Sequence, residues 1–173
     1  MGIWESIQTA VDRVTGSSAS ISVESDKDTI RPGESMTVRI SVKNGPAALE
    51  ARSVLLEIQG LEVIDLPRHA SWTNMVEDVT EAAAHSKGRT GPKSLVTQGS
   101  AKTCEATIKV SPGLSLSPGE ERKFQGTFRL PANAQPTYEG KYAKHTWRMR
   151  VRLDVFGTDP DTGWHTFRVN TSQ

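Results

Sequence analysis

The chain has 173 residues, of which 35% are apolar and 6% aromatic, and a formal net charge of +1. This length favours one ordinary domain, and 21 basic against 20 acidic side chains give no reason to expect a nucleic-acid partner. The single cysteine excludes an intramolecular disulfide. Because no apolar run suits a membrane span or a secretion signal, the sequence predicts a cytoplasmic protein.

Residues 1–16 predict a short amphipathic helix that ends at Gly16. Its apolar side chains recur every three or four positions and include Trp4, Ile7, Val11 and Val14. Helices this short are marginal alone in water, so we expect the helix to dock on an end or open edge of the domain close to Ile21. The alternative is that it binds a membrane surface or a partner.

Residues 17–173 predict a single all-β domain. Short segments alternate apolar and polar side chains and are separated by turns rich in proline, glycine and asparagine. About seven such segments indicate a two-sheet antiparallel, immunoglobulin-like β-sandwich. The predicted core consists of Met36, Val38, Ile40, Val54, Leu56, Ile58, Ile108, Val110, Phe124, Phe128, Trp147, Met149, Val151, Leu153 and Phe167.

Two features interrupt this pattern. Gly60 lies within a predicted strand that runs on into residues 61–64, which makes it a candidate β-bulge. Residues 67–101 predict a long insertion with a helix between Thr73 and Gly88, followed by a loop. Long connections of this kind are either functional or disordered, and the sequence does not choose between the two.

Basic side chains alternate with the apolar ones on several predicted strands. The candidate partner-binding set consists of Arg148, Arg150, Arg152, Arg39, Lys43, Lys109 and Arg129, and Lys123 also occupies an outward position on its predicted strand. If several of these strands share a sheet, its outer face is a basic patch. One interpretation is an ordinary solvated face with acidic partners from loops. The other is a site for an acidic protein surface, a phosphorylated segment or a lipid headgroup.

No catalytic, metal or cofactor site is predicted. The four histidines, residues 69, 85, 145 and 165, lack ligand spacing, and Cys104 has no assignable base beside it. Residues 159–163 place two aspartates in a loop with a glycine, and a turn explains them better than a calcium site. We therefore expect a protein without enzymatic activity.

The order of three segments resembles the arrestin-like superfamily. These are Arg31-Pro32-Gly33-Glu34, then residues 116–131 with Ser117-Pro118-Gly119-Glu120, then residues 136–151 with Tyr138-Glu139-Gly140. The layout is most similar to that of the bacterial sporulation-control proteins of this group. Arrestins have two sandwiches, whereas this length suits about one, and no buried charged cluster of the arrestin phosphate sensor is recognisable.

The resemblance implies a non-catalytic adaptor or scaffold that binds protein partners of unknown identity. A peripheral membrane regulator that uses the N-terminal helix and a basic sheet face is the alternative. The sequence does not indicate the oligomeric state.

Overall fold

The computed structural model describes residues 19–65, 98–157 and 159–171, and these residues form strands and loops. The strands are β1 (Ser20–Ser25), β2 (Thr29–Ile30), β3 (Ser35–Lys43), β4 (Leu49–Asp65), β5 (Gln98–Ser111), β6 (Leu114–Leu116), β7 (Glu121–Arg129), β8 (Tyr138–Glu139), β9 (Ala143–Val155) and β10 (His165–Val169). Three of them have only two or three residues, so seven longer strands carry the fold, as predicted. The helices predicted at 1–16 and near 73–88 lie outside the described residues. Within the described ranges, no helix is long and apolar enough to cross a membrane.

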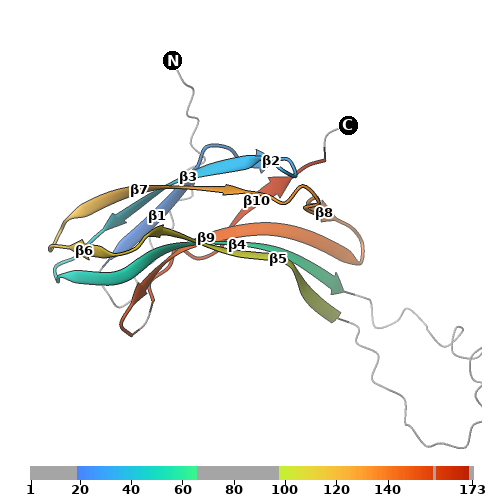
Figure 1. The fold of residues 1–173 in the computed structure, drawn as a ribbon. Helices are drawn as coiled ribbons and strands as arrows, with labels where there is room; N and C mark the ends of the chain where they lie inside the picture. The colour runs from blue at the N-terminus through green and yellow to red at the C-terminus, as the bar shows by residue number, and fades with distance from the viewer. Residues whose placement is uncertain (1–18, 66–97, 158, 172–173) are drawn as a thin grey trace, which may run out of the picture.

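The strands form two sheets that pack face to face (Figure 1). The small sheet has the order β1-β3-β7. The large sheet has the order β2-β10-β9-β4-β5, with β6 and β8 added beside β4 and β9. The described pairings are antiparallel except that of β2 with β10. The two-sheet sandwich expected from the sequence is therefore present.

The strand β9 lies at the centre of the large sheet, between β4 and β10. Its residues alternate between buried and half-buried, because successive side chains of a strand point to opposite faces. Trp147, Met149 and Val151 are at most 4% exposed. The predicted inward face of this strand is therefore confirmed.

Most of the predicted core is buried, but three members are not. Ile108, Val110 and Phe124 are only partly buried, although they pack against the core. They lie on β5 and β7, which are edge strands of the large and the small sheet. An edge strand has a neighbour on one side only, so strand periodicity identifies the inward face but not how completely it is covered.

The two Pro-Gly-Glu sequences form the same turn. Gly33 and Gly119 have φ angles of 81° and 72°, which a residue with a side chain rarely adopts. In residues 31–34 and 117–120, the closing glutamate N–H donates to the carbonyl of the first residue, at 3.0 and 3.1 Å. Its carboxylate accepts the N–H of that residue, at 3.1 and 2.8 Å. Each turn leads directly into a strand of the small sheet, β3 or β7.

We predict that Glu120 stabilises the fold in a pH-dependent way. The hydrogen bond from the Ser117 N–H, followed by that from Arg122, lowers the pKa of the Glu120 carboxyl. A lowered folded-state pKa means that the stabilisation is present above the unfolded pKa and is lost as the pH falls through the folded one. Urea denaturation between about pH 3 and 7 measures the free energy of unfolding. Toward acidic pH this free energy should fall less steeply for Glu120→Gln than for the wild type. Parallel curves for the two proteins would contradict the prediction.

Two features of β5 differ from those expected, the position of the bulge and the start of the strand. The irregularity predicted at Gly60 is present, but the extra residue is Thr103 on β5, because Gly60 pairs with Cys104 and Leu61 with Lys102. The strand β5 begins at Gln98, so the end of the predicted insertion 67–101 is strand rather than loop. Glycine and serine there indicate a loop locally, but pairing with the end of β4 makes the segment extended.

Candidate functional site

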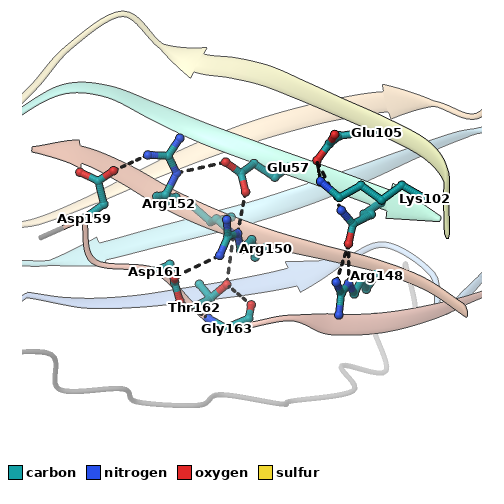
Figure 2. A network of polar contacts seen from close by, with 12 residues as sticks. Glu57, Lys102, Glu105, Arg148, Arg150, Arg152, Asp159, Asp161, Thr162 and Gly163 are labelled. Atoms are coloured by element: carbon teal, nitrogen blue, oxygen red, sulfur yellow. Dashed lines mark hydrogen bonds and ion pairs between the residues drawn. The ribbon is translucent and has the colours of Figure 1, made fainter. Parts of the chain in front are cut away.

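The three arginines of β9 lie on the outer face of the large sheet, beside Glu57 of β4 (Figure 2). Glu57 accepts a hydrogen bond from Arg150 Nε at 2.6 Å and one from Arg152 Nε at 3.0 Å. The Glu57 side chain is 15% exposed, and the two arginine side chains are 28% and 26% exposed. These two charges of the predicted basic face are therefore bound by a carboxylate of the neighbouring strand.

The connection between β9 and β10 folds back over the same arginines. Asp161 contacts Arg150 at 3.4 Å, and Asp159 contacts Arg152. Both aspartates also order the backbone, because Asp159 accepts the Val155 N–H at 3.1 Å and Asp161 the Gly163 N–H at 2.7 Å. The loop predicted at residues 159–163 is therefore part of the charge network.

Arg148 has a different environment from its two neighbours. Its Nε and Nη2 donate to Gln59 Oε1 at 2.9 and 2.5 Å, so its partner is an amide oxygen. The centroid of the Trp164 ring lies 4.4 Å from the guanidinium carbon of Arg148 and 4.6 Å from that of Arg150. At these distances the ring face attracts both cations. Trp164 thus holds the start of β10 against the arginines of β9.

We predict that Glu57→Gln lowers the free energy of unfolding by about 1–2 kcal/mol, because two half-buried guanidinium groups lose a shared carboxylate. Urea denaturation measures the loss, and amide exchange at Thr162 should become faster as the loop loosens. The control is Arg52→Ala, which removes the pair with Asp154. Since the Arg52 side chain is 75% exposed, we expect a loss below about 0.5 kcal/mol there. Equal effects of the two variants would contradict the prediction.

The remaining predicted cations do not join this network. Arg39 and Lys43 lie on β3, and Lys123 and Arg129 on β7, so these four share the outer face of the small sheet. Lys109 lies exposed on β5, in the large sheet. The predicted set is thus divided between the two sheets and does not form one patch.

The outer face of the small sheet carries a shallow groove of about 670 Å³. Its polar lining consists of Ser22, Glu24, Arg39, Ser41, Glu121, Lys123 and Gln125. Glu121 accepts the Ser41 hydroxyl at 2.8 Å and lies 3.6 Å from Lys123. The Ser41 hydrogen bond and the Lys123 charge lower the pKa of Glu121, so both signs of charge are present in the groove.

A buried polar cluster lies inside the sandwich. His145 is fully buried, its Nδ1 donates to the Pro136 carbonyl at 3.0 Å, and the Thr103 hydroxyl lies 2.6 Å from its Nε2. Because a carbonyl can only accept, the proton is on Nδ1, and neither ring nitrogen is free to act as a base. His145 has the inward parity of Trp147 and Met149, a signal that sequence analysis missed. The cluster is structural.

The other candidates for chemistry give no site. Burial raises the pKa of the Cys104 thiol, which disfavours the reactive thiolate. The hydrogen bond to Glu62 raises the pKa of Tyr138. In the part of the chain that the structure describes, no three histidine, cysteine, aspartate or glutamate side chains are grouped to hold a metal ion.

Neither a family model nor a curated protein matches the chain. Its structure is similar to the crystal structure of Spo0M, a sporulation control protein from Bacillus subtilis, with a TM-score of 0.60 and 21% sequence identity. The match covers 90% of this chain and 50% of Spo0M, so the chain spans about half the length of that protein. At this identity the similarity shows the fold alone: the chain shares the arrestin-like β-sandwich fold of the Spo0M structure.

Proposed function

We propose that the chain is a non-catalytic cytoplasmic adaptor or scaffold that binds a protein partner on the outer face of the small sheet. The observation that supports this proposal is the polar groove between β1, β3 and β7. Arg39 and Lys123 line the groove, and Lys43 and Arg129 lie on the same face. A partner surface with acidic and hydrogen-bonding side chains matches this lining, and complementary charge favours its association.

The large sheet is a poorer surface for an anionic partner. Arg150 and Arg152 already bind Glu57 and the aspartates of the β9–β10 loop. An anion would have to displace those carboxylates, which removes one ion pair for each new one formed. In the groove, Lys123 also lies 3.6 Å from the Glu121 carboxylate, but its side chain is 80% exposed, so a partner can reach its ammonium group from the solvent side.

Charge reversal on each face tests the proposal. A lysate from the source organism is passed over immobilised wild type, Arg39→Glu/Lys123→Glu, and Lys102→Glu/Lys109→Glu as a control with the same charge change on β5. We expect the wild type and the control to retain the same partner and the first variant to lose it. Identical retention by all three proteins, or no retained partner, contradicts the proposal.

A peripheral membrane regulator is the second candidate. Residues 1–18 lead into β1, which belongs to the sheet whose outer face carries the four cations Arg39, Lys43, Lys123 and Arg129. An apolar stripe beside a basic face suits an anionic lipid surface. Sedimentation with anionic vesicles, with and without residues 1–16, tests this function. Equal and negligible binding by both forms removes it.

A further inference from the structure

The hydrophobic core is incompletely covered along one side of the sandwich. Four partly buried apolar residues pack against the core: Cys104, Ile108 and Val110 on β5, and Phe124 on β7. The strand β5 is the edge of the large sheet and β7 the edge of the small one. We name the apolar strip formed by these four residues the β5–β7 seam.

The two edge strands approach closely at Gly126 without being hydrogen-bonded neighbours. A Cβ at Gly126 would lie 3.2 Å from Val110 Cγ2 and 3.4 Å from Leu56 Cδ2. The absence of a side chain thus lets β7 rest on the core beside β5. On either side of this contact the seam residues keep part of their surface exposed.

The opposite side of the sandwich is closed. Ile21 and Val23 of β1 are 4% and 6% exposed, and Ile30 of β2 is 1% exposed. A helix docked close to Ile21, as the sequence suggested, would find these side chains already covered. Ile64, Tyr142 and Phe156 are also exposed, but among the described residues the partly buried apolar side chains that pack against the core lie at the seam.

We propose that residues 3–14 dock on the β5–β7 seam through the stripe of Trp4, Ile7, Val11 and Val14. The apolar side chains of this segment recur at helical spacing, and so short a helix needs an apolar surface to fold against. Because it belongs to the same chain, its effective concentration at the seam is high.

The position of residue 19 and the lengths of the linker, the helix and the seam allow this docking. Ser20 pairs with Lys43 of β3, and Lys43 pairs with Glu121, so residue 19 lies at the end of the small sheet where β7 begins. The edge of β7 is two strand spacings away, about 10 Å, and residues 15–19 reach about 16 Å when extended. A helix of residues 3–14 is about 18 Å long. The seam from Val110 to Cys104 measures about 20 Å along β5.

The single native cysteine allows a direct test in the full-length protein. Trp4→Cys places a second thiol at the end of the apolar stripe that would lie toward Cys104, and the matched control Glu5→Cys places one on the polar face. Under mild oxidation we expect an intramolecular disulfide with Cys104 in the stripe variant only, with Ile3→Cys and Ile7→Cys covering other registers. No disulfide in any stripe variant, equal yields from the control, or disulfide-linked dimers instead would overturn the proposal.

The alkylation rate of Cys104 gives an independent readout. Ile7→Asp/Val11→Asp should raise the rate with a small maleimide about tenfold, whereas Gln8→Ala should leave it unchanged; a tenfold change corresponds to about 1.4 kcal/mol of docking free energy. Near-ultraviolet circular dichroism checks that the sandwich stays folded. A rate that is fast in the wild type, or slow in every variant, would show that this segment does not cover the seam. A rate as fast in the wild type as in Ile7→Asp/Val11→Asp, together with sedimentation of the wild type but not of this variant with anionic vesicles, would assign the stripe to a membrane.

Discussion

Trp147→Ala should lower the free energy of unfolding by about 3–5 kcal/mol, the usual cost of truncating a buried tryptophan. Trp147 is 1% exposed and packs against Phe167 and His145, with ring centroids 6.1 and 5.6 Å away. Its Nε1–H donates to the Gln135 carbonyl at 2.7 Å. The substitution therefore leaves a cavity and also frees the segment that connects β7 to β8.

Urea denaturation followed by circular dichroism measures the loss, and two variants separate its causes. Trp147→Phe keeps an aromatic ring but removes the N–H donor, so we expect an intermediate loss of about 1–3 kcal/mol. Trp164→Ala removes a half-buried tryptophan from the outer face, where we expect about 1 kcal/mol. A loss below about 1 kcal/mol for Trp147→Ala would contradict the central place of this residue.

Gly60→Ala should lower the free energy of unfolding by about 2–4 kcal/mol. A Cβ at Gly60 would lie 2.6 Å from Thr103 Oγ1 and 3.3 Å from His145 Nε2. Thr103 must then move away from His145, which breaks their hydrogen bond and leaves a fully buried ring nitrogen unpaired. The extra methyl group and the lost hydrogen bond act together.

A double-mutant cycle tests this explanation. Thr103→Ala removes the atom that the new methyl group would strike, so Gly60→Ala should cost less in that background than in the wild type. Gly99→Ala is the control for a strand glycine, because no atom lies within 4 Å of its added Cβ. Strict additivity of the two substitutions would show that Thr103 does not cause the loss.

The partners of the arginines could not be read from the sequence. Arg150 binds Glu57, which is 93 positions away, and Arg148 binds Gln59, which is 89 positions away. The parity of β9 places the arginines on one face, but only the pairing of β4 with β9 brings Glu57 beside them. The same parity placed His145 inside the sandwich, yet the hydroxyl opposite it depends on the extra residue in β5.

The sequence alone determined what depends on neighbours along the chain. The alternation in β9 settles which side chains face the core, and the Pro-Gly-Glu turns mark the starts of β3 and β7, because strand period and glycine φ are local properties. Only the tertiary structure decided which strands share a sheet. That choice separated Arg39 and Lys123 from Arg148 and left the β5–β7 seam open. Strand pairing and edge exposure depend on residues far apart in the chain, and no local pattern encodes them.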